Sequence, residues 1–344
     1  MKTSTTFSVP EKKYMQRALE LARYGAGFVS PNPMVGAVIV APDGRIIGEG
    51  WHRKFGEGHA EVNAVASVRP EDEHLFGQST IYVTLEPCSH YGKTPPCSLL
   101  LIEKGIGRVV VGSPDPFPLV SGRGIKMLRE AGIEVVENFM RNECDALNRR
   151  FITAHTLGRP YILLKWAQSS DGFIAAINHD GTPRSIKLSN AATSVLMHSQ
   201  RALYDAILVG SNTIIIDNPS LTTRLWPGGS PRPVTFRSPR IPEDATVFSR
   251  DCILIDSSIQ TGNISLGLEL NRLYSEYGIT SLMVEGGAST LNSFIENNLF
   301  DEIRVEISPD IIGDGIYAPP IPTPCNLISS EKFGSTLILE YRKH

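Results

Sequence analysis

One histidine, one glutamate and two cysteines have the types and spacing of a catalytic zinc centre. His59 and Glu61 form a His-x-Glu pair, Cys88 follows a proline, and eight residues separate Cys88 from Cys97. One imidazole and two thiolates make a nitrogen–sulfur set that suits Zn²⁺, and three protein ligands leave the fourth position for water. The sequence therefore predicts a catalytic zinc site with His59, Cys88 and Cys97 as ligands.

Glu61 is predicted to carry protons at this site rather than to bind the metal. Its carboxylate lies two residues beyond His59 and can take a proton from the water and hand it to a leaving amine. Zinc deaminases of nucleobases use this arrangement, although their two cysteines are usually separated by two residues. A structural zinc site is an alternative, but it would leave Glu61 without a role. A second alternative is that no metal binds, and that His59 is a surface histidine and the two cysteines are buried thiols.

The elements that must position these residues alternate between strands and helices. Helical apolar spacing and turn signals predict that His59 opens one helix and Cys97 another, so that two helix N-termini point at one place and favour thiolates. The pattern is typical of an α/β layered domain with a largely parallel sheet. The predicted helices cover 11–25, 59–68, 97–104 and 125–131, and the predicted strands 34–40, 45–50, 80–85, 108–112 and 133–136.

The pattern weakens between residues 144 and 160, so we predict two domains, 1–147 and 148–344. The second half has predicted strands at 161–166, 206–210 and 281–285. The proline-rich stretch 227–242 is expected to form a loop that contains at most one short strand. A Gly-rich turn, Gly286-Gly287-Ala288-Ser289-Thr290, follows the last of these strands and opens a helix. Such a turn can cradle a phosphate with its N–H groups.

Composition limits the classes of function. A chain of 344 residues with 41% hydrophobic and 20% charged residues is neither disordered nor a coiled coil. The net charge of −3 lacks the basic excess of duplex-binding proteins, so we expect no nucleic-acid partner. No apolar run reaches the ~18 residues of a membrane span, and we expect no membrane partner. The N-terminus lacks a secretory pattern, so a cytoplasmic location is expected.

Four segments resemble the deaminase domain of the bifunctional riboflavin-biosynthesis deaminase–reductase family: PNPMVGAVIV at 31–40, HAEVNA at 59–64, TLEPCSHYGKTPPC at 84–97 and GRGIK at 122–126. The resemblance implies a cytidine-deaminase-like α/β/α zinc domain followed by a dihydrofolate-reductase-like α/β domain. It implies hydrolytic deamination of 2,5-diamino-6-ribosylamino-4(3H)-pyrimidinone 5′-phosphate, then NADPH reduction of the ribosyl to the ribityl side chain. One zinc ion per chain, NADPH and a homo-oligomeric state follow from the same resemblance.

The resemblance also implies site residues, carried over position by position. In the first domain, the residues implied to line the substrate pocket are Asn32, His52 and Lys93. In the second, Lys165 and Asp217 are implied at the reaction centre. Its implied substrate-binding residues are Arg201, Leu221, Arg224 and Glu285, and its implied NADPH-binding residues are Ala167, Thr213, Asp217, Ser238, Gly287, Ala288, Ser289, Thr290 and Leu291.

The sequence departs from the family pattern at three places. Phe117 replaces the asparagine of an Asp-Pro-Asn-Pro motif, Lys187-Leu188-Ser189 replaces Trp-Ile-Thr, and Phe236-Arg237-Ser238 replaces Val-Asp-Ser. The last two leave open a deaminase-only enzyme whose second domain serves assembly. A deaminase of RNA or single-stranded DNA is a further alternative, against which the charge and the lack of a basic, aromatic-rich patch argue. The sequence decides neither the oligomeric state nor whether an intermediate passes directly between the two sites.

Overall fold

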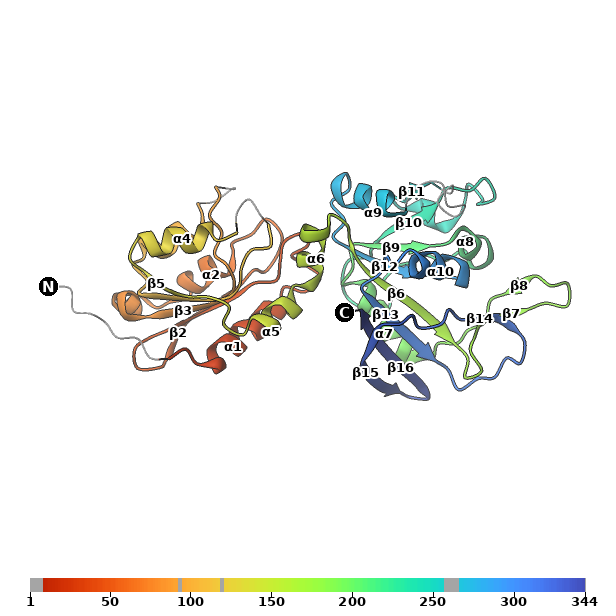
Figure 1. Ribbon diagram of the computed structural model, residues 1–344, viewed down its shortest axis with the longest axis horizontal. Coiled ribbons are helices and arrows are strands. Elements are labelled where there is room, and N and C mark those ends of the chain that lie inside the picture. The colour runs from red at the N-terminus through yellow and green to blue at the C-terminus, as the bar shows by residue number, and fades with distance from the viewer. Residues whose placement is uncertain (1–8, 92–94, 118–120, 257–265, 344) are drawn as a thin grey trace. The chain divides into compact units, whose positions relative to one another are not determined.

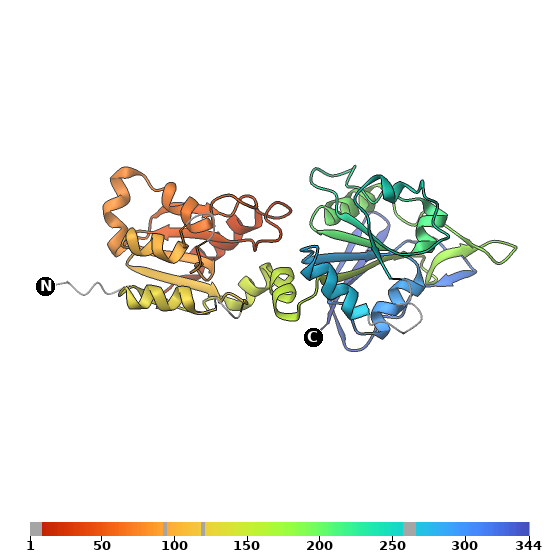
Figure 2. The same cartoon turned by 90° about the horizontal axis from the view of Figure 1, so that it is seen from above.

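The computed structural model describes residues 9–91, 95–117, 121–256 and 266–343. The chain divides into two compact units, Met1–Thr156 and Leu157–His344, which Figures 1 and 2 show from two sides. Lys93, predicted to contact substrate, lies outside the described residues. Among the described residues, no helix has both the length and the apolar character needed to cross a bilayer.

Unit 1 is built on a five-stranded sheet in the order β2-β1-β3-β4-β5. β1 is antiparallel to both β2 and β3, whereas β3, β4 and β5 are parallel, so the sheet is mixed rather than largely parallel. The difference arises because the first two strands form a hairpin, as their short turn demands. The strands are β1 (Gly36–Val40), β2 (Ile46–Trp51), β3 (Thr80–Leu85), β4 (Arg108–Ser113) and β5 (Glu134–Val136).

Helices cover both faces of this sheet (Figure 1). Apolar residues of α2, α3 and α4 pack with Ile39, Ile81 and Val109 on one face, and residues of α1 and α5 pack with Val38 and Val110 on the other. The result is the expected α/β/α sandwich. The helices are α1 (Lys12–Arg23), α2 (Ala60–Ala66), α3 (Cys97–Glu103), α4 (Arg123–Glu130), α5 (Arg141–Leu147) and α6 (Arg149–Leu157), with the 3₁₀ helix η1 (Pro70–Gln78).

Two helices, α5 and α6, occupy the stretch where the sequence pattern weakens, and neither was predicted. Their apolar periodicity is faint because each helix buries only one residue, Cys144 in α5 and Ala154 in α6. A helix that buries so little of its surface lacks the apolar stripe from which helices are recognised in a sequence.

Unit 2 contains an eight-stranded sheet in the order β11-β10-β9-β12-β6-β13-β16-β15. The first six of these strands are parallel neighbours, and β16 and β15 add antiparallel pairings at one edge. Its strands are β6 (Tyr161–Gln168), β9 (Ala206–Val209), β10 (Arg232–Phe236), β11 (Ile253–Ile255), β12 (Ser281–Glu285), β13 (Glu302–Ile307), β15 (Cys325–Phe333) and β16 (Thr336–Lys343).

A second, three-stranded sheet of unit 2 projects from the main one (Figures 1 and 2). It consists of β7 (Phe173–Ile177), β8 (Pro183–Arg184) and β14 (Gly315–Tyr317). The helices of unit 2 are α7 (Ala191–Arg201), α8 (Ser211–Asp217), α9 (Leu266–Ser275) and α10 (Ala288–Glu296), with the 3₁₀ helix η2 (Thr246–Ser249).

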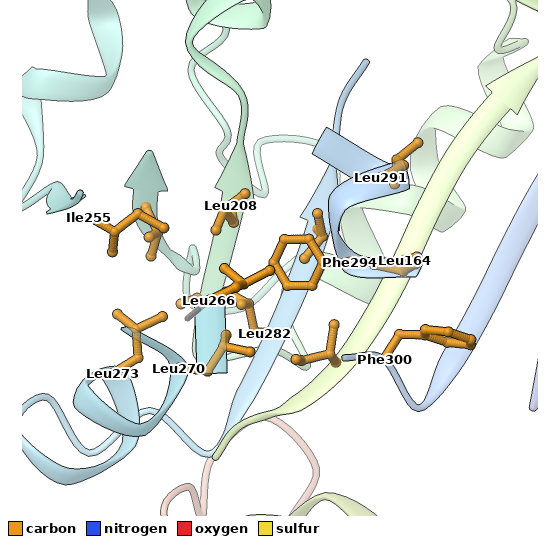
Figure 3. Close-up of a cluster of buried hydrophobic side chains, with 14 of the residues drawn as sticks. Leu164, Leu208, Ile255, Leu266, Leu270, Leu273, Leu282, Leu291, Phe294 and Phe300 are labelled. Carbon is orange, nitrogen blue, oxygen red and sulfur yellow. The ribbon is translucent and has the colours of Figure 1, made fainter. Parts of the chain in front are cut away.

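The largest core lies between one face of the main sheet and helices α9 and α10. Figure 3 shows Leu164, Leu208 and Leu282 of the sheet packed with Leu270 of α9 and Phe294 of α10. These side chains come from every second residue of their strands, so the intervening residues, Lys165 among them, face the opposite side of the sheet. The core therefore holds the strands that carry the second set of candidate site residues.

Candidate functional site

The three predicted zinc ligands converge in unit 1. His59 is the N-cap of α2 and Cys97 is the first residue of α3, while Cys88 lies in the loop after β3. His59 Nδ1 is 3.5 Å from Cys88 Sγ and 3.3 Å from Cys97 Sγ, and all three donor atoms lie within 4.8 Å of one another. A tetrahedral zinc site separates nitrogen and sulfur by about 3.5 Å and two sulfurs by about 3.8 Å, from the usual bond lengths. The donor set therefore fits a zinc ion.

The local electrostatics prepare one thiolate before any cation binds. Hydrogen bonds from Cys97 and His59 lower the pKa of Cys88 to about 4, although burial opposes them. The Cys97 thiol keeps its proton because it donates to the Cys88 sulfur, which raises the pKa of Cys97. The hydrogen bond to Cys88 also raises the pKa of His59. A cation that displaces the shared protons would convert the cluster into a full ligand set.

Glu61 lies in the first turn of α2, beside the cluster but outside its three converging donors. Its side chain is buried, and burial together with the charge of Cys88 raises the pKa of Glu61 to about 7. A carboxyl group whose pKa lies near neutrality can both accept and release a proton in one reaction cycle. The geometry therefore suits Glu61 to proton transfer.

A cavity of 530 Å³ opens on this centre and is lined by both predicted polar residues that the structure describes, Asn32 and His52. Asn32 Nδ2 lies 3.2 Å from His52 Nε2, and His52 Nδ1 lies 3.2 Å from Gly58 O. Burial lowers the pKa of His52, which favours the neutral ring. A neutral ring that donates from Nδ1 to Gly58 O can accept from Asn32 at Nε2, which fixes the orientation of the asparagine amide.

Sequence reasoning missed a group of three rings in the lining of the cavity. His155 packs against Phe151 at 4.3 Å and against Phe117 at 6.1 Å between ring centroids, and all three line the cavity. Phe151 and His155 come from α6, the helix that was not predicted. The only local signal was their separation by four residues, which brings two rings to one face of a helix.

Glu86 also lines the cavity and organises its rim. Its buried carboxylate accepts four main-chain N–H bonds: Asp115 N at 3.2 Å, Gly122 N at 2.9 Å, Gly124 N at 3.0 Å and Ile125 N at 3.4 Å. It thereby joins the loop before Cys88 to the start of α4.

We expect Glu86→Gln to lower the stability of unit 1 by about 2–4 kcal/mol, because the amide nitrogen would face N–H donors and leave some of them without an acceptor. Thermal unfolding of the full chain, followed in parallel with ammonia release, measures this. Glu71→Gln is the matched control, since Glu71 is exposed. Equal melting curves for the two variants would refute the assigned role of Glu86.

The second set of candidate residues gathers at the main sheet of unit 2. Lys165 of β6 lies opposite Glu285 of β12 in register, and Arg201 of α7 reaches Glu285 with Nη2 at 2.8 Å from Oε2. Burial raises the pKa of Glu285, but the charges of Arg201 and Lys165 outweigh it and lower that pKa. Lys165, Arg201 and ionised Glu285 therefore form one charged group.

Asp217, predicted at the reaction centre, and the other two predicted substrate residues, Leu221 and Arg224, lie at the end of α8 and on the segment after it. Asp217 ends that helix with an exposed side chain, and Arg224 is also exposed, with Nη1 3.1 Å from Ser220 Oγ. Leu221 is buried with a φ of 52°. Arg201 Nη1 donates to Thr222 O at 3.1 Å, so this segment is tied to the charged group through its main chain.

Most of the predicted cofactor residues lie at the N-termini of α8 and α10. A Cβ added to Gly210 would lie 2.5 Å from Thr290 Oγ1, and one added to Gly286 would lie 3.5 Å from Thr213 Oγ1, so the two turns touch. Gly286 has a φ of 154°, which only glycine adopts without strain. Open space surrounds the Cβ position of Gly287. This open, glycine-lined junction of two helix N-termini suits a phosphate group.

The remaining predicted cofactor residues differ in exposure. Ala167 and Ser238 are half-buried, and Ala288 and Ser289 lie in the first turn of α10. The side chain of Leu291 belongs to the core (Figure 3), and its N–H donates to Gly287 O at 3.3 Å. Lys187 and Arg237, which belong to the two departures from the family pattern in this unit, are both exposed.

Comparison with known proteins covers both units. The family model of the cytidine and deoxycytidylate deaminase zinc-binding region matches residues 9–113, and that of the RibD C-terminal domain matches residues 160–339. Riboflavin biosynthesis protein RibD of Actinobacillus pleuropneumoniae is 39% identical over 95% of this chain and 94% of its own length. The RibD protein of Bacillus amyloliquefaciens is 40% identical over 94% of this chain and 90% of its own length.

Solved structures agree with these matches. The Thermotoga maritima diaminohydroxyphosphoribosylaminopyrimidine deaminase/5-amino-6-(5-phosphoribosylamino)uracil reductase is 38% identical and superposes with a TM-score of 0.85, covering 97% of this chain and 98% of its own. Acinetobacter baumannii RibD is 30% identical, with a TM-score of 0.84 over 96% of this chain and 98% of its own. The expected fold class is confirmed, and neither a nucleic-acid deaminase nor a deaminase-only enzyme is favoured. The chain belongs to the RibD family of bifunctional riboflavin-biosynthesis deaminase–reductases.

Proposed function

We propose that unit 1 deaminates 2,5-diamino-6-ribosylamino-4(3H)-pyrimidinone 5′-phosphate and that unit 2 reduces the ribosyl group of the product with NADPH. The observation that carries this proposal is the convergence of His59, Cys88 and Cys97 beside buried Glu61 in one cavity. The family matches over both units support the order of the two activities along the chain.

In the deaminase site, zinc held by His59, Cys88 and Cys97 would acidify the water that attacks the ring carbon bearing the 2-amino group. Glu61 accepts a proton from that water and delivers it to the amine, which departs as ammonia. The second proton of the water ends on the neighbouring ring nitrogen, and a carbonyl group remains. Asn32, oriented by neutral His52, pairs with polar atoms at the ring edge. Lys93 stays a prediction as the contact that attracts the substrate phosphate.

In the reductase site, the substrate with its sugar ring opened is a Schiff base, and NADPH, when bound, would supply the hydride for its C1′. The nitrogen takes up a proton, for which Lys165 is the proposed donor. The phosphates of NADPH would bind at the N-termini of α8 and α10. Ala167, Asp217 and Ser238 would contact other parts of the NADPH molecule. Leu221 and Glu285 would contact the sugar of the substrate.

Arg201 and Arg224 are proposed to hold the substrate phosphate. A guanidinium group has five N–H donors. Arg201 uses three of them, two on Glu285 and one on Thr222 O, so two are left for phosphate oxygens. Arg224 contributes an exposed fork that can approach the same anion from the surface segment.

A coupled assay tests the proposal with the zinc-loaded full chain and the diaminopyrimidinone ribosyl phosphate. Ammonia release without NADPH, followed by NADPH oxidation once it is added, is the expected result. Ammonia release without NADPH oxidation or NADPH binding would refute the reductase assignment. Failure to release ammonia from the zinc-loaded chain would refute the deaminase substrate.

A further inference from the structure

A row of charged residues, with buried members at its centre and half-buried Glu340 at one end, crosses four neighbouring strands of the main sheet of unit 2. In register, Glu285 of β12 lies opposite Lys165 of β6, Lys165 lies opposite Arg304 of β13, and Arg304 lies opposite Glu340 of β16. Paired residues on adjacent strands point to the same face, as do residues two apart on one strand. Glu306, two residues after Arg304, therefore joins the row on the face of Lys165.

Ion pairs connect Lys165 through Glu306 and Arg304 to Glu340. Glu306 Oε2 lies 3.5 Å from Lys165 Nζ, and Glu306 Oε1 lies 3.4 Å from Arg304 Nε. Arg304 Nη1 in turn contacts Glu340 Oε1 at 2.6 Å. Glu306 is 1% exposed, Arg304 5% and Lys165 7%. Glu306 is thus a buried carboxylate held between two buried cations.

The charges of this group balance. Lys165, Arg304 and Arg201 carry three positive charges, and Glu285, Glu306 and Glu340 carry three negative ones. Buried ions are costly unless they are paired, and removal of one partner leaves the other uncompensated. In a net-neutral group of this kind every ion has a partner of opposite charge, which offsets part of the cost of burying it.

The contact between Glu306 and Lys165 is an ion pair without a short hydrogen bond. Charge-assisted N–H···O bonds are usually about 2.7–2.9 Å long, so the 3.5 Å separation leaves the ammonium donors uncommitted to this carboxylate. Glu306 Oε2 has no hydrogen-bond partner within the described residues, although it is buried. A buried polar atom in this state calls for a specific cause, and a role in a reaction is one such cause. Glu306 holds the ammonium by charge and leaves its protons for a ligand.

We propose that Glu306, backed by Arg304, is a positioning residue for Lys165 in the reduction step. The inference rests on the proposed function, which places Lys165 at the reaction centre. Lysine is a point charge on a flexible stem, so its position depends on a fixed counter-ion. Ligands of open α/β sheets bind at the carboxyl ends of parallel strands. Glu306 is the last residue but one of β13, and Lys165 is level with Glu285, the last residue of β12. Glu306 directs the ammonium toward that edge.

Glu306→Gln in the full chain tests the proposal. With the deaminated substrate and NADPH, kcat of reduction should fall about 100-fold, the usual effect of misplacing a reacting group by about 1 Å. KM, the affinity for NADPH and ammonia release should not change. Glu302→Gln is the matched control, because Glu302 lies on the same strand and pairs with Arg342 at 2.7 Å. A kcat of reduction equal to that of the parent chain for Glu306→Gln would overturn the proposal.

A double-mutant cycle separates positioning from a general effect on folding. If Glu306 acts through Lys165, adding Glu306→Gln to Lys165→Met should leave the residual rate unchanged. A further fall by the same factor would mean that Glu306 acts on the fold and would overturn the proposal. If Lys165→Met alone reduces substrate normally, the role of Lys165 itself is wrong, which the single variant reveals.

Glu306→Asp keeps the test valid should the glutamine variant fail to fold. It retains the charge but shortens the side chain by one methylene, so we expect the chain to fold and kcat to fall, with NADPH affinity intact. A folded Glu306→Asp chain with unchanged kcat would contradict a positioning role.

Discussion

Replacement of Glu61 by glutamine should lower the rate of ammonia release by about 10³-fold, within the range expected for loss of a general acid–base group. The amide has the size of the carboxyl group but cannot take a proton from the attacking water. The zinc content should remain one ion per chain, because Glu61 is not among the three converging donors. Ammonia release and metal content, measured on the same preparation, give the result.

Two controls make the Glu61 experiment specific. Glu57→Gln changes an exposed glutamate four residues away and should leave ammonia release unaltered. NADPH oxidation with the deaminated substrate should proceed normally in both variants, since it belongs to unit 2. If Glu61→Gln released ammonia at the parent rate with zinc bound, proton transfer by Glu61 would be excluded.

Replacement of Lys165 by methionine should lower the rate of NADPH oxidation by about 10³-fold, because it removes the proposed proton donor to the nitrogen of the Schiff base. Ammonia release should be retained. The substitution also leaves Glu306 and Glu285 short of a cation, so unit 2 should lose about 3–5 kcal/mol of stability. Stopped-flow NADPH oxidation at a temperature where the variant is folded separates the rate from the stability.

Lys187→Met is the matched control for Lys165→Met, since it removes an exposed lysine from the same unit. It should change neither the rate of NADPH oxidation nor the melting temperature of unit 2. Equal reduction rates for the two variants would remove Lys165 from the reaction centre.

Local signals in the sequence determined the zinc centre. His59 and Cys97 open helices as predicted, and Cys88 follows strand Thr80–Leu85 as predicted. This succeeded because helix N-termini and strand ends are encoded by nearby residues. The ligand types alone then indicated the metal, and the position of Glu61 two residues after a ligand indicated its task.

The resemblance, rather than spacing, supplied most of the second site. Nothing local to Lys165 or Glu285 indicates that they become neighbours, since they lie on strands far apart in the chain. Their proximity follows from the pairing of β6 with β12, and pairing depends on the whole sheet. The sequence alone therefore did not determine this charged group.

Only the tertiary structure decided which residues complete each site. Two of the three rings that line the deaminase cavity, Phe151 and His155, come from α6, a helix whose faint apolar stripe hides it from periodicity. Arg304 and Glu306 meet Lys165 because β13 pairs with β6 in one particular register. A strand's alternation determines which residues share a face, but not which strand lies beside it. Those choices are made by the packing of the complete chain, where the burial of the core and the neutralisation of buried charges must be satisfied together.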